Sequence, residues 1–231
     1  MTTYFTYADI TSKIINDLSL DGEDFVIPSE LLGYAQEAVR EVEAEIHAIN
    51  EDYFLSRYQL TLISGQDAYD LPTNIYAHKI RRLVYNNGTT VYAIERFKDW
   101  KKFEKMAENV ATGTGTVYAY MIDNSIPGYP KIVFSPPIRE DGAFVTAWFI
   151  RSANKFTGAD SDICDIPEFI NFVLQYIKVR CYEKEVGHPN LQIAKIDLEQ
   201  QRKQMNDTLT GMVPDAENDI EGDFSFYADH S

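Results

Sequence analysis

The chain has 231 residues, of which 45% are hydrophobic and 13% aromatic, so it can bury the core of one large domain or two small ones. Its formal net charge of −15 excludes a nucleic-acid binder that neutralises phosphates over a broad basic surface. The N-terminal segment lacks a basic region followed by an apolar run, and no apolar stretch approaches the ~20 residues that cross a bilayer. We therefore expect no signal peptide, no membrane span and synthesis in a cytoplasm. The two cysteines, Cys164 and Cys181, are expected to be reduced core residues.

Two helices are predicted before residue 55. One face of a first helix over residues 7–18 carries the apolar side chains Tyr7, Ile10, Ile14 and Leu18. Pro28 begins a second helix, because proline is tolerated in the first turn. The apolar residues of this helix recur at alternating gaps of three and four, at Leu32, Ala35, Val39, Val42, Ile46, Ile49 and Tyr53. Its opposite face is charged, and is either solvated or turned to a charged neighbour.

From about residue 55 the apolar residues alternate, which predicts strands. Alternating segments occur at 57–64, 78–87, 90–97, 116–123, 130–137 and 143–153. Asn86-Asn87-Gly88 is typical of a hairpin turn, and a short charged helix is predicted over about 97–108. Because Gly and Pro separate the strands, the order indicates an antiparallel sheet or small sandwich rather than βαβ units.

Helical spacing returns near residue 166 and again over 191 to about 209, where a thin apolar stripe indicates an outer helix. The sequence therefore predicts an α+β fold. A bundle of about four helices is formed by 1–54 and 160–212, an antiparallel β-rich module with a short helix is inserted at 55–159, and 213–231 is an extended acidic C-terminal arm. This arm has no Lys or Arg but contains Phe224, Phe226 and Tyr227.

No segment has the spacing of a catalytic, metal or phosphate site. The Gly113-Thr114-Gly115 loop precedes a strand rather than a helix, the four histidines lie on different elements, and there is no C-x-x-C pair. We expect no catalytic residue, no cofactor and no metal.

Four acids cluster at Asp160, Asp162, Asp165 and Glu168. They could be paired catalytic carboxylates or calcium ligands, but the spacing lacks the glycine and the distal acid of an EF-hand loop. Helix capping is the favoured interpretation, with Asp165 as the N-cap residue and Pro167 in the first turn.

One stretch is both basic and aromatic. Its cations are Arg96, Lys98, Lys101, Lys102 and Lys105. They interleave with Phe97, Trp100 and Phe103, a mixture that could stack bases and pair phosphates. The three-residue spacing of the aromatics favours a short amphipathic helix lying on a sheet with its lysines outward. This helix is also a candidate contact for an acidic partner surface.

The segment "SGQDAYDLP" at 64–72 combines a turn with an aromatic residue and a proline. We expect Gly65 to permit the turn, Tyr69 and Leu71 to alternate onto the core face, and Pro72 to end the strand. The segment is predicted to be a hairpin joint after the second helix, with Tyr69 buried.

The ordered segments over 28–209 resemble the head-to-tail adaptor (connector) proteins of tailed bacteriophages. The best marker is Gly65-Gln66 followed by Tyr69-x-Leu71-Pro72, joined to the preceding helix. A second marker is "IPEF" at 166–169, which opens a helix after a strand ending in "FIRSANKF".

The resemblance implies a ring, usually dodecameric, that attaches below the portal in the neck of the virion and has no enzymatic activity. Such a ring extends the DNA channel, seals the filled head, lets genomic DNA pass without specific binding and offers a platform for the tail tube or nozzle. C-terminal segments of relatives often reach the portal, which makes Phe224, Phe226 and Tyr227 candidate portal contacts here. An acidic protein suits such a conduit, because a negative wall repels phosphates.

The alternative is a glycan-binding or glycan-cleaving β-domain. Its motivation is the aromatic wealth of the β region, at Tyr118, Tyr120, Trp148 and Phe149, beside acids such as Asp123. An exposed row of these aromatics near a carboxylate pair would favour it, whereas aromatics that alternate into a core would leave it without support.

Overall fold

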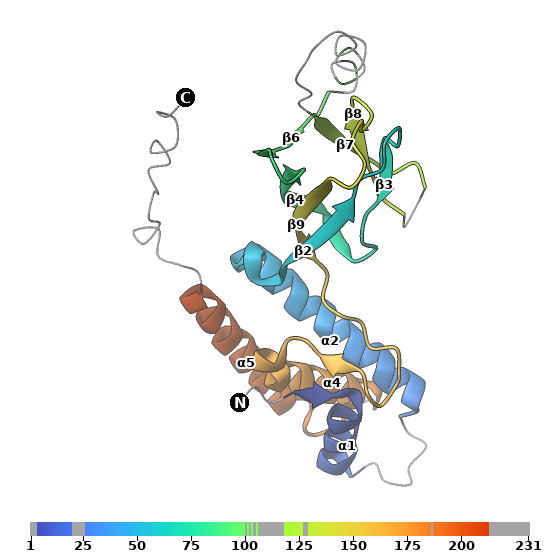
Figure 1. Cartoon of the computed structure of the whole chain (residues 1–231). Coiled ribbons are helices and arrows are strands. Elements are labelled where there is room, and N and C mark those ends of the chain that lie inside the picture. Colours follow the sequence, from blue (N-terminus) through green and yellow to red (C-terminus); the bar gives the residue numbers. More distant parts are fainter. Residues whose placement is uncertain are drawn as a thin grey trace. The chain divides into compact units, whose positions relative to one another are not determined.

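A computed structural model describes residues 4–19, 26–99, 101, 103, 105, 118–126, 129–185 and 187–212. The chain forms two compact units, which are described separately: a helical unit of 1–50 with 154–231, and a second unit of 51–153 (Figure 1). Within the described residues the structure has four α-helices and largely antiparallel sheets. The predicted α+β class is confirmed.

The helical unit contains four helices, one 3₁₀ turn and one pair of very short strands. They are β1 (Phe5–Thr6), α1 (Tyr7–Leu18), α2 (Pro28–Ile49), β10 (Ile163–Cys164), η3 (Pro167–Phe169), α4 (Ile170–Lys184) and α5 (Leu191–Met212). The central helix is α4, which contacts α1, α2 and α5. Helices from the two ends of the chain therefore share one core.

This core is built largely from the apolar faces that the spacing predicts, although the predicted Leu18, Leu32 and Ile49 are only partly buried and Tyr53 lies beyond the end of α2. The buried residues of α1 are Tyr7, Ile10 and Ile14, and those of α2 are Leu31, Ala35, Ala38, Val39, Val42 and Ile46. Phe172, Val173 and Ile177 of α4 are almost completely buried. Because α4 is covered on several sides, its buried residues do not form a single stripe, as is usual for a helix inside a bundle.

The charged face of α2 is turned to charged neighbours, one of the two options that its sequence left open. Arg180 of α4 lies 3.1 Å from Glu37, and Arg202 of α5 lies 2.9 Å from Glu45. The Arg202 guanidinium also lies 5.7 Å from the centre of the Phe172 ring. These ion pairs connect α2 to both C-terminal helices, so the segments distant in sequence are joined by charge as well as by apolar packing.

The second unit is a small β-sandwich. Its elements are η1 (Glu51–Phe54), β2 (Leu55–Thr61), β3 (Ala68–Asp70), β4 (Ile75–Asn86), β5 (Val91–Ala93), β6 (Glu95–Arg96), β7 (Ala119–Asp123), β8 (Lys131–Ser135) and β9 (Phe144–Arg151). One sheet has the order β2-β9-β4-β5 and the other β3-β8-β7-β6, and a single hydrophobic core contains buried residues of both. The pairing is antiparallel except between β6 and β7, which run parallel.

The hairpin between β4 and β5 forms where the sequence predicts it. The Asn87 N–H donates to the Thr90 carbonyl at 3.3 Å, and Gly88 takes a φ of +87°, which glycine adopts without steric cost. Val84, Tyr85 and Asn86 then pair with residues of β5. This turn fixes the register of the two strands.

Two local predictions are wrong. Residues 62–67 do not join a hairpin, because β2 pairs with β9 and β3 pairs with β8 in the other sheet; the segment carries the chain from one sheet to the other. Asp165 is not the N-cap residue, since Ile166 precedes η3 and supplies no side-chain cap. The Asp165 carboxylate instead accepts a hydrogen bond from the Asn154 backbone N–H at 3.1 Å.

The two cysteines are buried in the helical unit, as the sequence predicts. Burial raises the pKa of the Cys164 and Cys181 thiols to about 11. Both are therefore protonated near neutral pH and are poor nucleophiles in the folded protein.

Candidate functional site: assembly surfaces

The marker segment at 64–72 is a structural corner of the sandwich. Gly65 has a φ of +83°, a conformation that side chains other than glycine rarely adopt. Tyr69 is buried, as predicted, and its hydroxyl accepts a hydrogen bond from the Ile63 N–H at 2.9 Å and donates to the Ile63 carbonyl at 3.1 Å. Burial raises the pKa of Tyr69. Leu71 is also buried, so the segment shapes the core and presents no reactive group.

The basic segment after β5 is described only in part. Arg96 lies in β6, and Lys98, Lys101 and Lys105 are exposed, whereas Lys102 and Trp100 lie outside the described residues. Phe103 is buried, and its ring centre lies 6.3 Å from that of Phe97. In the described part the aromatics therefore face inward and the cations outward, as an amphipathic segment requires.

The acidic cluster organises a loop of the helical unit. The Asp162 carboxylate accepts hydrogen bonds from the backbone N–H groups of Thr157 (2.5 Å) and Gly158 (3.1 Å), and these bonds lower its pKa. The carbonyls of Asp162 and Asp160 accept the N–H groups of Tyr7 and Ala8 at the start of α1. Across the described part of the chain, no group of acids, histidines and cysteines is arranged to hold a metal ion.

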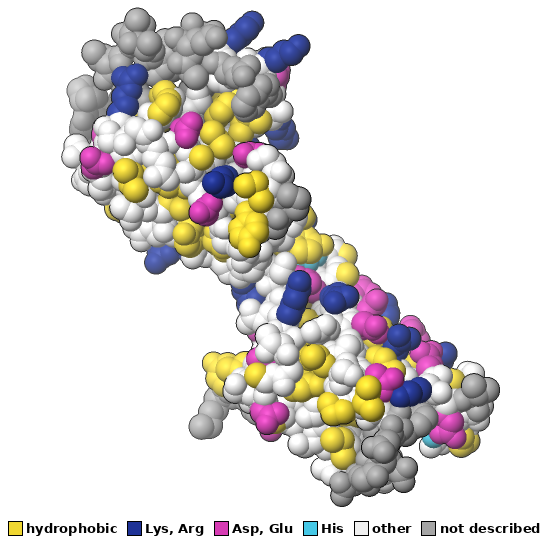
Figure 2. All heavy atoms as spheres, turned by 90° about the vertical axis from the view of Figure 1, so that its right-hand side faces the viewer, with side chains coloured by type: hydrophobic (Ala, Val, Ile, Leu, Met, Phe, Trp, Pro, Cys, Tyr) yellow, Lys and Arg dark blue, Asp and Glu magenta, His cyan; other side chains and the backbone are white. Residues whose placement is uncertain are grey.

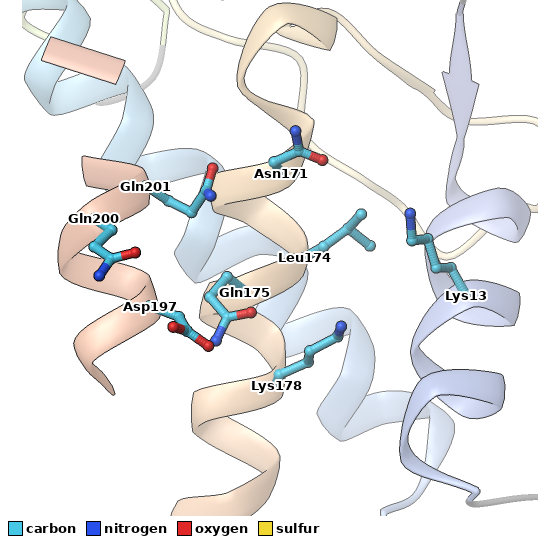
Figure 3. Close-up of a pocket in the computed structure, with 8 residues that line it drawn as sticks. All are labelled: Lys13, Asn171, Leu174, Gln175, Lys178, Asp197, Gln200 and Gln201. Atoms are coloured by element: carbon cyan, nitrogen blue, oxygen red, sulfur yellow. The ribbon is translucent and has the colours of Figure 1, made fainter. Parts of the chain in front are cut away.

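A groove runs along α4 between α1 and α5 (Figure 3). Its central part has a volume of about 240 Å³ and is lined by Lys13, Asn171, Leu174, Gln175, Lys178, Asp197, Gln200 and Gln201. Figure 3 shows Leu174 and Lys178 extending from α4 toward α1. Lys178 pairs with Asp17 at 2.6 Å, and the Gln175 amide donates to the Ala194 carbonyl at 3.0 Å.

Two further cavities adjoin the groove toward the N-terminal end of α4, one on the side of α1 and one on the side of α5. An apolar cavity of about 290 Å³ adjoins it at Leu174 and Lys13, and is also lined by Tyr4, Phe5, Asp9, Ile10 and Ile170. A smaller cavity of about 110 Å³ adjoins it at Asn171 and Gln201. The lining consists of carboxamides, ammonium groups, the carboxylates of Asp9, Glu168 and Asp197, and apolar side chains. No nucleophile lies beside a base among these residues, so the lining suits contact with a polypeptide better than covalent chemistry.

The outer face of α5 exposes apolar side chains. Ile193 and Ile196 are 61% and 60% exposed, while Ala194, Leu198, Met205 and Leu209 on the opposite side of the helix are buried. The spacing predicts a thin stripe of Leu191, Ala194, Leu198, Met205 and Leu209, of which the last four are buried and Leu191 is partly buried. Ile193 and Ile196 lie one helical turn apart and so form a small apolar surface on α5.

The sandwich exposes Trp148 on the outer side of β9. Its ring is 37% exposed, and the register places Arg57 of β2 and Arg82 of β4 on either side of it. The Arg57 guanidinium lies 6.0 Å from the centre of the Trp148 ring. Alternation along β9 places Trp148 on the face opposite the buried Phe149, whereas no local pattern in the sequence marks the two arginines as its neighbours.

On the face that Figure 2 shows, hydrophobic side chains lie among acidic and basic ones on both units.

A comparison with known protein families finds a match over most of the chain. The family model of the SU10 adaptor protein matches residues 5–219. The chain belongs to the SU10 adaptor protein family. It is therefore an adaptor protein of bacteriophages, with a structural role among other virion proteins. A search of curated proteins found no match to the chain.

Two further observations concern this SU10-family adaptor. Of the aromatics that motivated a glycan site, Tyr118, Tyr120 and Phe149 are buried in the sandwich core, and Trp148 is the exposed one. The exposed row of aromatics that would support a glycan site is therefore absent from the described residues.

In the described residues, no helix is long and apolar enough to cross a membrane. The candidate portal contacts Phe224, Phe226 and Tyr227 lie outside the described residues.

Proposed function

We propose that this SU10-family adaptor assembles as a ring, a dodecamer, in the neck of the virion between the portal and the tail. The ring extends the DNA channel, seals the filled head and carries the tail tube or nozzle protein. The family match over residues 5–219 is the observation that carries this proposal. It spans both units, so the whole assembly of helices and sandwich belongs to the adaptor function rather than one unit alone.

The charge of the chain supports passage of DNA without specific binding. A net charge of −15 per copy gives a ring a strongly negative surface, which repels phosphates and prevents the duplex from adhering to the wall. The exposed cations Arg96, Lys98, Lys101 and Lys105 are then available for an acidic protein partner.

We propose the C-terminal segment 213–231 as the arm that contacts the portal. Its aromatic residues Phe224, Phe226 and Tyr227 give it apolar anchors between acids, the residue types that dominate binding energy at many interfaces. In this proposal the arm adds affinity for the portal, while contacts between copies close the ring.

Mass photometry and negative-stain imaging of the full chain, alone and mixed with its portal protein, test this function. We expect ring-shaped complexes of portal and adaptor in the mixture. The triple variant F224A/F226A/Y227A should lose most of its portal binding, whereas S225A in the same segment should bind like the unsubstituted chain. An adaptor that remains monomeric and never binds portal would contradict the proposal.

A further inference from the structure

The outer face of the sheet β2-β9-β4 carries a small cationic and apolar surface. Trp148 lies between Arg57 and Arg82 across the three strands, and Leu55, two residues before Arg57 on the same side of β2, is 43% exposed. We call Leu55, Arg57, Arg82 and Trp148 the sheet patch. An exposed tryptophan flanked by arginines has the composition of a protein-binding hot spot.

The arginines of the sheet patch lack acidic partners within the part of the chain that the structure describes. The neighbouring cations do have them, because Lys79 and Arg81 pair with Glu51, and Arg81 also lies 2.9 Å from Asp52. Neither Arg57 nor Arg82 takes part in such an ion pair. Glu51 and Asp52 are thus paired with Lys79 and Arg81, and the positive charge of the sheet patch remains available to a partner.

Acids and bases are distributed unequally between the two units. Residues 51–153 hold 12 of the 21 Lys and Arg but only 11 of the 36 Asp and Glu. The rest of the chain holds the other 9 cations and 25 acids. The sandwich therefore offers few acidic partners for the arginines of the sheet patch. The helical unit of a second copy offers many.

The outer face of α5 matches the sheet patch in chemistry. Ile196 and Asp207 lie on the side of the helix opposite its buried residues. Ile193 and Asp197 are exposed at the edge of this face toward the α4 groove, which Asp197 also lines. In the described residues neither aspartate forms an ion pair, and Lys203 is the cation on the same side. Two exposed isoleucines with two unpaired aspartates therefore complement an exposed tryptophan and leucine with two unpaired arginines.

We propose that the sheet patch of one copy binds the outer face of α5 on the next copy. The two surfaces differ, so the contact is heterologous, and a heterologous contact that repeats by rotation closes into a ring. This inference rests on the proposed ring and names the surfaces that join its subunits. Apolar side chains meet at the centre, and Arg57 and Arg82 pair with Asp197 and Asp207.

The contact is tested by exchanging its charges on the full chain. The variants are R57E/R82E, which reverses the sheet patch, and D197K/D207K, which reverses α5. In a ring of either variant alone, the two surfaces of every contact carry charge of the same sign and repel each other. Neither variant should therefore form rings with portal. An equimolar mixture restores opposite charges at every contact when the two variants alternate, and rings with an even number of subunits should return.

Matched controls separate this contact from general effects of charge and size. R139E makes a single Arg→Glu change, half the charge change of R57E/R82E, at an exposed arginine of the sandwich outside the sheet patch, and Y129A removes an exposed aromatic of the same unit. We expect both to assemble normally, whereas W148A should raise the protein concentration needed for half assembly by about tenfold or more. Thermal melting within a few degrees of the unsubstituted chain confirms that each variant is folded.

The outcomes are distinguishable. If the unsubstituted chain forms no ring with portal, the proposed function fails. If it forms rings and R57E/R82E does so equally well, the contact between sheet patch and α5 is wrong while the ring stands. If that variant assembles normally but binds duplex DNA more weakly in a fluorescence anisotropy titration, the patch contacts nucleic acid and the proposal is overturned.

Discussion

The helical unit and the sandwich of this adaptor obtain stability in different ways. In the helical unit α4 packs against helices from both ends of the chain, and ion pairs of Arg180 and Arg202 connect those helices. The sandwich is one continuous segment whose core is rich in aromatics, among them Tyr69, Tyr118 and Phe134. Its charges are nearly balanced, while the helical unit and its C-terminal segment carry the acidic excess.

The difference indicates a division of labour. An acidic helical unit with exposed apolar residues on α5 and a groove along α4 offers several surfaces to partners. The sandwich, with its own core, presents a cationic and aromatic patch in its described part. Charge segregated between two bodies of one chain favours contacts between unlike bodies of neighbouring copies over contacts between like bodies.

Matched core truncations give the largest expected effect. Phe134 in the sandwich and Phe172 in the helical unit are both almost completely buried, so each change to alanine should cost about 3–5 kcal/mol of unfolding free energy. Differential scanning calorimetry of the full chain should show that F134A lowers the melting temperature of one transition and F172A that of another. Equal shifts of all transitions by both variants would show that the units unfold as one.

Removal of the Tyr69 hydroxyl should have an intermediate effect confined to the sandwich. Y69F leaves the N–H and the carbonyl of Ile63 without their buried partner, which costs about 1–3 kcal/mol. Because no carboxylate takes part in these two bonds, the loss should be the same at about pH 4 and at pH 7. Urea denaturation measures it, with Y129F as the control at an exposed tyrosine; equal stability of the two variants would refute the role of the corner.

The Asp162 loop should give a smaller effect that depends on pH, in the helical unit. Hydrogen bonds lower the pKa of Asp162 in the folded protein, so its contribution is present above the unfolded pKa of about 4 and is lost as the pH falls through the folded value. D162N should therefore lower the melting temperature at pH 7, and the difference from the unsubstituted chain should disappear near pH 2. D160N, which keeps the backbone carbonyl that binds Ala8, is the matched control. A D162N deficit that does not change with pH would contradict this account.

Ionic strength gives the smallest effect and compares the two units directly. Added salt screens repulsion among the acids of the helical unit, whereas the nearly balanced sandwich has little repulsion to lose. Between about 0.05 and 0.5 M sodium chloride, the helical transition should rise by a few degrees and the sandwich transition should change less. Scanning calorimetry checks this, and a larger rise for the sandwich would contradict it.

Residue spacing predicts the elements of this fold well where they are long. The bounds of α1, the start of α2 at Pro28 and the strands around the Asn86-Asn87-Gly88 turn follow from periodicity and turn chemistry. Spacing does not reveal which strands pair, so it predicts a hairpin at 62–67 where the chain crosses between the two sheets. Strands of two or three residues, such as β1, β3 and β10, contain too few alternations to be detected.

The candidate surfaces could be predicted only in part. Alternation along β9 separates Trp148 from Phe149, but the sequence does not show that Arg57 and Arg82 flank it, because β2 and β4 pair with β9 only in the folded sheet. Asp165 lies two residues before Pro167, a pattern that is frequent at helix N-termini. The 3₁₀ turn η3 begins at Pro167 with Ile166 as its N-cap, and α4 begins only at Ile170. The sequence thus predicts which side chains of one strand share a face. It does not predict which residues of other strands lie beside them in the folded sheet.

A cryo-electron microscopy reconstruction of the virion neck tests the central claim most directly. We expect a closed ring of adaptor copies below the portal, with the sandwich of each copy against α5 of the next and the C-terminal segments directed to the portal. A neck in which this chain occupies no ring between portal and tail would contradict the account.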